Sequence, residues 1–266
     1  MSYDADILSL LTETGTFVAE EFARFDERQV EYKAENDPFS FVDVEADQRL
    51  RAGCAEIIPG SGFINEELAN QPGQNEYRWI IDPIDGTSNF THGVPHFCIS
   101  LALQRNEETI LGYVYQPITQ ELFRAEKGQG ATLNGDPISR SLREELGQAL
   151  VATGFPYAVE DWVSDYLQSL LGIMQRTHGL RRFGSAALDL AYVAAGRLDV
   201  FLEFNLKPWD VAAGSLIVQE AGGQVSDFTG GDRYLFGGEM LATNGHIHQA
   251  LLDLLADSPM MQRLQR

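Results

Sequence analysis

The sequence predicts an α+β fold in which an antiparallel-rich N-terminal half with flanking helices precedes an α/β C-terminal half. Between residues 97 and 138, apolar runs follow one another with only turn residues between them, which is typical of antiparallel strands. After residue 148, short apolar runs alternate with segments of helical periodicity, which is typical of an α/β arrangement. We therefore expect two halves, 1–146 and 147–266, which share an interface because no flexible linker separates them.

The N-terminal half is expected to begin with two helices. Apolar residues recur at helical spacing over 5–28 and over 42–58, where Pro59 and Gly60 end the second helix. The polar segment 32–41 between them is interpreted as a loop or loose hairpin. The strands expected in this half lie at 62–64, 79–81, 97–104, 109–116 and 122–126, and a turn is expected at Asn134-Gly135.

The C-terminal half is expected to alternate strands with helices. Pro208 suits the first turn of a helix, and Gly222-Gly223 would end that helix. The expected strands are 150–153, 200–204, 224–226 and 240–243, and the expected helices are 159–176, 186–195, 208–221 and 246–255.

Composition excludes several classes of protein. A chain of 266 residues with 44% hydrophobic and 22% charged residues is globular, and no apolar run reaches the length of about 18 residues that a membrane span needs. The formal charge of −20 argues against nucleic acid or an anionic membrane as a partner. The N-terminus lacks a basic secretory signal, and Cys54 and Cys98 are expected to be buried free thiols, so we expect a cytoplasmic protein.

The stretch Trp79–Phe90, WIIDPIDGTSNF, carries the strongest local signal for chemistry. Asp82 and Asp85 follow an apolar strand, and Gly86 allows a ligand to approach the backbone closely. Thr87 then offers a hydroxyl and an amide where a helix could start. Hard oxygens beside amides that suit phosphate indicate Mg²⁺ and a phosphoester. Because Asp, Pro and Gly also favour ordinary turns, this motif alone leaves a structural turn equally open.

Two further acidic positions favour the metal hypothesis. Glu66 follows a short apolar strand, as Asp82 does, so both carboxylates are expected at strand ends. Asp210 is expected in the first turn of a helix. The helix dipole also favours a carboxylate there, so Asp210 taken alone is better explained structurally.

Four segments together resemble the inositol monophosphatase family of Mg²⁺-dependent, lithium-sensitive sugar-phosphate phosphatases. They are FINEE (63–67), WIIDPIDGTSNF (79–90), GSAALDLAYVAAGRLD (184–199) and KPWDVAAGSLIVQEAGG (207–223), in the family's order. The resemblance implies a layered αβαβα sugar-phosphatase fold, two or three Mg²⁺ ions as cofactor, a small phosphate ester as substrate and a homodimer.

The resemblance also implies roles for individual residues. The metal ligands would be Glu66, Asp82, the backbone carbonyl of Ile84, Asp85 and Asp210. The catalytic residues that orient and activate a water would be Glu66, Thr87 and Asp47. The substrate-binding residues would be Gly86, Thr87, Ser88, Gly184, Ser185, Ala186 and Glu203.

The segment 42–47 departs from the family pattern. The family usually has a compact Val-Thr-x-x-Asp sequence before the second helix, whereas this segment is one residue longer and has Asp43 where threonine is usual. Asp47 is the expected partner of Thr87, and Asp43 or Glu45 could take its place.

The residues Thr87-Ser88-Asn89-Phe90 are similar to those of the inositol-type subgroup. We therefore expect hydrolysis of myo-inositol 1-phosphate by direct attack of water, since no cysteine nucleophile is evident. The alternatives within the superfamily are histidinol phosphate, fructose 1,6-bisphosphate and adenosine 3′,5′-bisphosphate. A more remote alternative is a non-catalytic acidic protein that binds metal.

Overall fold

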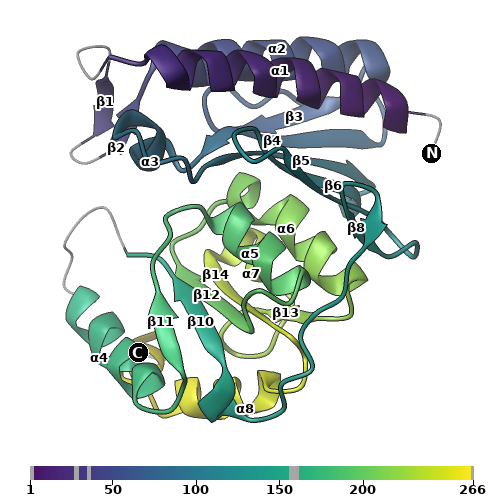
Figure 1. Cartoon of the computed structure of the whole chain (residues 1–266). Coiled ribbons are helices and arrows are strands. Elements are labelled where there is room, and N and C mark those ends of the chain that lie inside the picture. Colours follow the sequence, from purple (N-terminus) through teal and green to yellow (C-terminus); the bar gives the residue numbers. More distant parts are fainter. Residues whose placement is uncertain (1–2, 27–29, 35–36, 156–161, 265–266) are drawn as a thin grey trace.

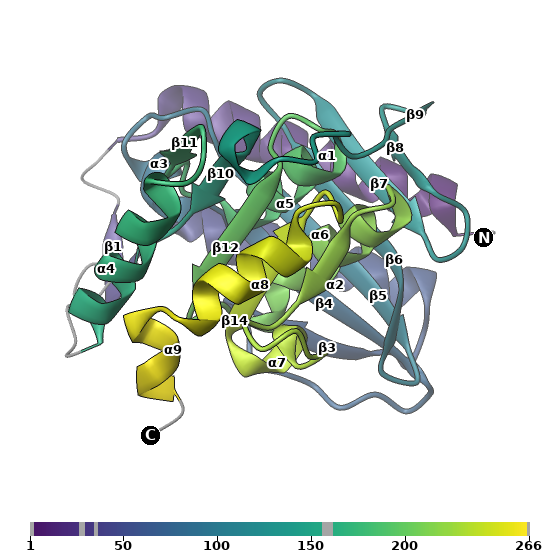
Figure 2. The ribbon, with the colours of Figure 1, turned by 90° about the horizontal axis from the view of Figure 1, so that it is seen from below.

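The described residues, 3–26, 30–34, 37–155 and 162–264, form five stacked layers in the computed structural model (Figure 1). One pair of helices covers a seven-stranded sheet, and two further helices separate this sheet from a five-stranded one. A last group of helices covers the far face of the five-stranded sheet and is seen from below in Figure 2. The layered αβαβα fold is therefore confirmed. The helices are, layer by layer, α1 (Asp4–Arg24) and α2 (Phe41–Ile57), α5 (Ala186–Ala194) and α6 (Pro208–Glu220), and α4 (Val163–Met174), α8 (His248–Ala256) and α9 (Pro259–Leu264).

The seven-stranded sheet is antiparallel except at one edge, where β3 runs parallel to β4. Its strands, in spatial and chain order, are β3 (Gly62–Asn65), β4 (Tyr77–Asp85), β5 (Cys98–Arg105), β6 (Glu108–Gln116), β7 (Glu121–Glu126), β8 (Ala131–Leu133) and β9 (Asp136–Pro137). Trp79 and Ile81 pack toward α1 and α2, whereas Ile80 between them packs toward α5 and α6. Since helices cover both faces, β4 is apolar at consecutive positions.

The five-stranded sheet is mixed. β11 (Gly179–Arg181), β10 (Leu150–Thr153) and β12 (Val200–Phe204) are parallel neighbours, whereas β14 (Glu239–Thr243) runs antiparallel to β12 and to β13 (Gln224–Ser226). The connection from β13 to β14 contains only the short helix α7 (Tyr234–Gly237) and returns the chain beside β13 in the opposite direction. The alternation of strands and helices predicted the main elements of this half, and the short connection between β13 and β14 accounts for their antiparallel pairing.

The two central helices are buried on nearly all sides, because each lies between the two sheets. Small residues allow this close packing. A Cβ on Gly112 of β6 would meet the Ala213 carbonyl oxygen of α6 at 2.7 Å, and one on Gly214 of α6 would meet the Leu190 Cβ of α5 at 2.6 Å. This packing fixes where the N-termini of α5 and α6 lie relative to the first sheet.

The expected elements are present, with ends that differ by a few residues. The loop or hairpin expected over 32–41 contains β1 (Glu31–Ala34) paired with β2 (Asp37–Phe39). The expected parts of helices at 27–28 and 159–161 lie outside the described residues. The short elements β8, β9, β11, α7 and α9 were not predicted, because each is too short for a periodic signal. The division at residue 146 stays a prediction. Within the described ranges, every helix is too short or too polar to cross a lipid bilayer.

Candidate active site

A cavity of about 320 Å³ lies where the end of β4 meets the N-termini of α5 and α6. The predicted site residues that line it are Glu66, Asp82, Ile84, Asp85, Gly86, Thr87, Ser88, Gly184, Ser185, Ala186, Glu203 and Asp210. These residues come from both sequence halves. Asp47 is the one predicted site residue that does not line this cavity.

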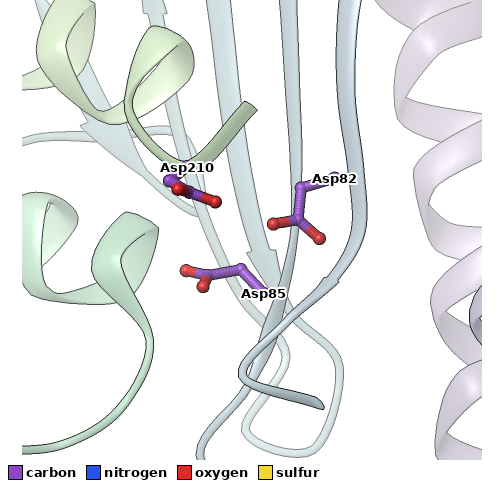
Figure 3. A group of neighbouring side chains, drawn as sticks. All are labelled: Asp82, Asp85 and Asp210. Atoms are coloured by element: carbon purple, nitrogen blue, oxygen red, sulfur yellow. The ribbon is translucent and has the colours of Figure 1, made fainter. Parts of the chain in front are cut away.

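Three carboxylates from two distant segments form a cluster in this cavity. Asp82, Asp85 and Asp210 each offer an oxygen, and these oxygens lie within 4.8 Å of one another. Figure 3 shows the three side chains directed toward a common space. Carboxylate oxygens at this spacing are the ligands that a hard divalent cation prefers, so the cluster fits Mg²⁺.

A β-bulge explains why Asp82 and Asp85 share one side of β4. Residues three positions apart in a regular strand point to opposite faces. Here Asp82 pairs with Ser100 and Asp85 with Cys98, so β4 contains one residue more than β5 between the two pairs. Pro83, which has no backbone N–H, lies within this irregular segment. The extra residue turns the second carboxylate to the side of the first.

Glu66 and Asp210 are brought to the cluster by their secondary structure. Asn65, at the end of β3, pairs with Ile81 in the parallel strand β4, so Glu66 continues beside Asp82. Asp210 lies in the first turn of α6, where its Oδ2 accepts a 2.6 Å hydrogen bond from the Lys207 N–H. Both expected positions, a strand end and a helix start, are therefore confirmed.

Burial and the charges of neighbouring carboxylates both raise pKa values in the acidic cluster. Burial raises the pKa of Asp82 well above its usual range, and the charges of Glu66, Asp85 and Asp210 raise it further. Burial, with the charges of Asp85 and Glu66, also raises the pKa of Asp210. Burial raises the pKa of Asp85 to about 6, although hydrogen bonds from Ser185 and the Ala187 amide oppose this change. A bound cation would relieve this repulsion.

Thr87 contacts Asp43 rather than Asp47. The Thr87 Oγ1 lies 3.1 Å from Asp43 Oδ1 and 3.0 Å from the Ile84 carbonyl oxygen, and it can donate to either. Asp43 Oδ2 also accepts from the Ser40 hydroxyl at 2.7 Å and the Ser40 N–H at 2.8 Å. Asp43 is thus both the N-terminal capping partner of α2 and the neighbour of Thr87. Burial raises the pKa of Asp43, and these hydrogen bonds oppose the change.

Asp47 lies about one helical turn further along α2 and has a different set of partners. Its carboxylate accepts hydrogen bonds from the Asn65 side chain and, at 3.0 Å, from the Leu68 N–H. It therefore joins α2 to the segment after β3. Glu45, the third residue left open by the sequence, forms an exposed ion pair with Arg49. Of the three carboxylates left open by the sequence, Asp43 and not the expected Asp47 is thus the one that Thr87 contacts, and the part of either in activating a water stays a prediction.

Gly86 and Gly184 form two turns that pack against each other at the cavity wall. Gly86 has a φ of +106°, and a Cβ there would lie 3.1 Å from the His96 carbonyl oxygen and 3.2 Å from that of Gly184. The Asn89 side chain joins the two turns by donating to the carbonyl oxygens of His96 at 2.7 Å and Phe183 at 2.8 Å. The glycine predicted to allow close approach is thus required by its own backbone conformation.

Glu203, on β12, faces Gly154, the residue after β10. A Cβ on Gly154 would lie only 1.9 Å from Glu203 Oε1, so only glycine leaves room for this carboxylate. Burial raises the pKa of Glu203 to about 8, and the charge of Asp85 adds to this rise, whereas Arg182 opposes it. Further cavity residues to which no role in the site was assigned from the sequence are Gly154, Phe155, Arg182, Phe204, Asn205, Leu206, Lys207 and Trp209. Lys207 and Trp209 could have been found from their position beside Asp210.

The layered fold and its acidic cavity define the class of sugar-phosphatase-fold proteins. The chain belongs to the inositol monophosphatase family, since the model of that family matches residues 3–260. It is 42% identical over 242 residues to an inositol-1-monophosphatase of Caulobacter vibrioides, covering 90% of this chain and 94% of the relative. It is 43% identical over 243 residues to the Nus factor SuhB of Pseudomonas aeruginosa, covering 90% of each. The extragenic suppressor protein suhB of Bartonella henselae has a similar structure, with a TM-score of 0.92 and 37% identity over 97% of this chain and 99% of that one.

Proposed function

We propose that this protein is a Mg²⁺-dependent phosphatase that hydrolyses the phosphate monoester of a small polyol, with myo-inositol 1-phosphate as the preferred substrate. The main support for this proposal is that carboxylate oxygens of Asp82, Asp85 and Asp210 lie within 4.8 Å of one another, in the cavity that Thr87 also lines. A relative named inositol-1-monophosphatase and one named Nus factor SuhB are 42% and 43% identical to this chain. Because these names point to different functions, the support for catalysis comes from the residues of the cavity. The homodimer belongs to the same proposal and rests on the resemblance. The cytoplasmic location also belongs to it and is supported by the buried free thiols Cys54 and Cys98.

The residues that would hold two or three Mg²⁺ ions are Glu66, Asp82, the Ile84 carbonyl, Asp85 and Asp210. A phosphate group would be repelled from this cavity by its carboxylates and by a chain of net charge −20. Bound Mg²⁺ would supply positive charge for the phosphate and Lewis acidity for the attacking water and the leaving oxygen.

Thr87 and Asp43 would guide the proton of the attacking water. When Thr87 Oγ1 donates its proton to Asp43 Oδ1, 3.1 Å away, its lone pairs are free to accept a proton from water. Since burial raises the pKa of Asp43, this carboxylate takes up a proton more readily than an exposed one. Glu66, which follows β3, would orient the same water. The backbone amides of Gly86 and Thr87 would hold the phosphate.

The polyol would occupy the part of the cavity formed by Glu203, Ser88 and the turn Gly184–Ala186. A carboxylate accepts hydrogen bonds from hydroxyl groups, so Glu203 suits a substrate with several of them. The absence of a side chain at Gly154 leaves the space that the Glu203 carboxylate occupies.

Phosphate release from a panel of esters, with Mg²⁺ and then with excess EDTA, tests this proposal. The panel contains myo-inositol 1-phosphate, histidinol phosphate, fructose 1,6-bisphosphate and adenosine 3′,5′-bisphosphate. We expect the largest kcat/KM for myo-inositol 1-phosphate and no release in EDTA. A larger value for another ester would overturn the substrate assignment. Absence of release from every ester would favour a non-catalytic metal-binding protein.

Gly154→Ala is expected to impair recognition of the polyol. The new methyl group would displace the Glu203 carboxylate, so KM for myo-inositol 1-phosphate should rise about 10-fold. KM for p-nitrophenyl phosphate, which has no hydroxyl groups to recognise, should change little. Gly147→Ala is the matched control, because a Cβ at Gly147 meets nothing within 4 Å. Equal effects on both substrates would contradict the role given to Glu203.

A further inference from the structure

Ser185 lies at the start of α5, and its hydroxyl is directed to the proposed metal ligand Asp85. Its Oγ donates to Asp85 Oδ2 at 2.8 Å, and the Ala187 N–H donates to the same oxygen at 2.6 Å. The Cys98 thiol lies 3.9 Å from this oxygen on another side. Asp85 belongs to the first sheet and Ser185 to the central helix layer, so these bonds join two layers of the fold.

We infer that Ser185 is a positioning residue, which acts together with the Ala187 amide to fix the Asp85 carboxylate for binding a divalent cation. This inference rests on the proposed function. It assigns to the Ser185 hydroxyl a different role from the substrate contact that the family resemblance implied.

The fixed orientation follows from two donors that meet at one oxygen. Rotation of the Asp85 carboxylate would break both the Ser185 and the Ala187 hydrogen bond. A carboxylate bound in this way at Oδ2 is held in one plane and presents Oδ1 in a constant direction. Partners behind a metal ligand commonly set its orientation, and their removal weakens metal affinity.

The N-terminus of α5 contributes charge as well as geometry. Ser185 is the N-cap residue of this nine-residue helix, and the Ala187 amide lies in its first turn. The partial positive charge at a helix N-terminus stabilises a carboxylate bound there. The Ser185 side chain makes no capping bond to its own helix. Replacing this side chain therefore removes a bond to Asp85 without removing a cap from α5.

A substrate-contacting role fits the Ser185 hydroxyl poorly. The residue is only 1% exposed, and its hydroxyl has a single proton, which it donates to Asp85. The Cys98 sulfur lies 3.6 Å from the same Oγ and occupies part of its remaining surroundings. The contacts of this hydroxyl are therefore with the protein groups Asp85 and Cys98.

The test measures Mn²⁺ affinity of the metal-free full chain by electron paramagnetic resonance, beside steady-state kinetics. The variants are Ser185→Ala, Ser185→Gly and Ser185→Thr, and Ser226→Ala is the control because it removes a buried hydroxyl from β13 instead. We expect Ser185→Ala and Ser185→Gly to weaken Mn²⁺ binding by about 10- to 100-fold and to raise the Mg²⁺ concentration for half-maximal activity by a similar factor. KM at saturating Mg²⁺ should stay within about twofold, and Ser185→Thr, which keeps the hydroxyl, should restore Mn²⁺ binding.

Unchanged Mn²⁺ affinity in folded Ser185→Ala or Ser185→Gly, with a raised KM for myo-inositol 1-phosphate, would overturn the inference and restore the substrate contact. Glycine is well tolerated at an N-cap, so Ser185→Gly keeps the test valid if the alanine variant does not fold. Failure of the proposed function is a separate outcome, since the unmodified protein would then bind no Mn²⁺ or release no phosphate.

Discussion

Asp210→Asn is expected to abolish phosphate release while the protein stays folded. The substitution removes one of three carboxylates that lie within 4.8 Å of one another, so activity should fall by at least about 10³-fold. The asparagine oxygen can still accept the Lys207 N–H, which keeps the start of α6 intact. Loss of one repelling charge should also stabilise the metal-free protein, with a melting temperature about 2–4 °C higher for each kcal/mol gained.

The measurements for this variant are phosphate release and thermal unfolding, each with Mg²⁺ and with EDTA. Mg²⁺ should raise the melting temperature of the unmodified protein and have little effect on Asp210→Asn. Asp6→Asn is the control, because it removes an exposed carboxylate from the first turn of another helix, α1. Retained turnover in Asp210→Asn would refute the assignment of Asp210 as a metal ligand.

Asp43→Asn is expected to lower kcat by about 10²- to 10⁴-fold, the usual contribution of a positioned acid or base. The asparagine oxygen can still accept the Thr87 hydroxyl, 3.1 Å away in the unmodified protein, but the amide cannot take up its proton. KM should change little, because Asp43 is 1% exposed and does not line the substrate cavity.

Asp47→Asn provides the matched comparison one helical turn away. This variant places an amide group among the donors from Asn65 and Leu68, so the free energy of unfolding should fall by about 1–3 kcal/mol. Its kcat should be close to that of the unmodified protein. The opposite pattern, with turnover lost in Asp47→Asn and kept in Asp43→Asn, would reinstate the expectation drawn from the sequence.

Much of the acidic site could be predicted because its residues follow simple structural rules. Glu66 follows the end of β3 beside Asp82 of the neighbouring strand β4, and Asp210 lies in the first turn of a helix begun by Pro208. The order of the strands is also local in the first sheet, where each strand pairs with the next along the chain. Hydrophobic periodicity, together with proline and glycine at the ends of elements, therefore predicted the helices and strands of this half well.

What the sequence could not predict depends on contacts between distant segments. Asp43 and Asp47 are four residues apart on α2 and so lie on the same side of that helix. Only the packing of α3 (Thr87–Thr91) near the start of α2 brings Thr87 to Asp43. The fit of Glu203 against Gly154 joins β12 to the residue after β10, 49 positions away in the chain (203 − 154). The bulge between Asp82 and Asp85 is marked only by Pro83.

Anomalous diffraction from crystals soaked in Mn²⁺ and phosphate would locate the cations and so show whether these carboxylates bind metal. We predict anomalous peaks between Asp82, Asp85 and Asp210, with phosphate beside Gly86 and Thr87. Crystals soaked at millimolar Mn²⁺ that show these carboxylates ordered but no peak among them would contradict the account.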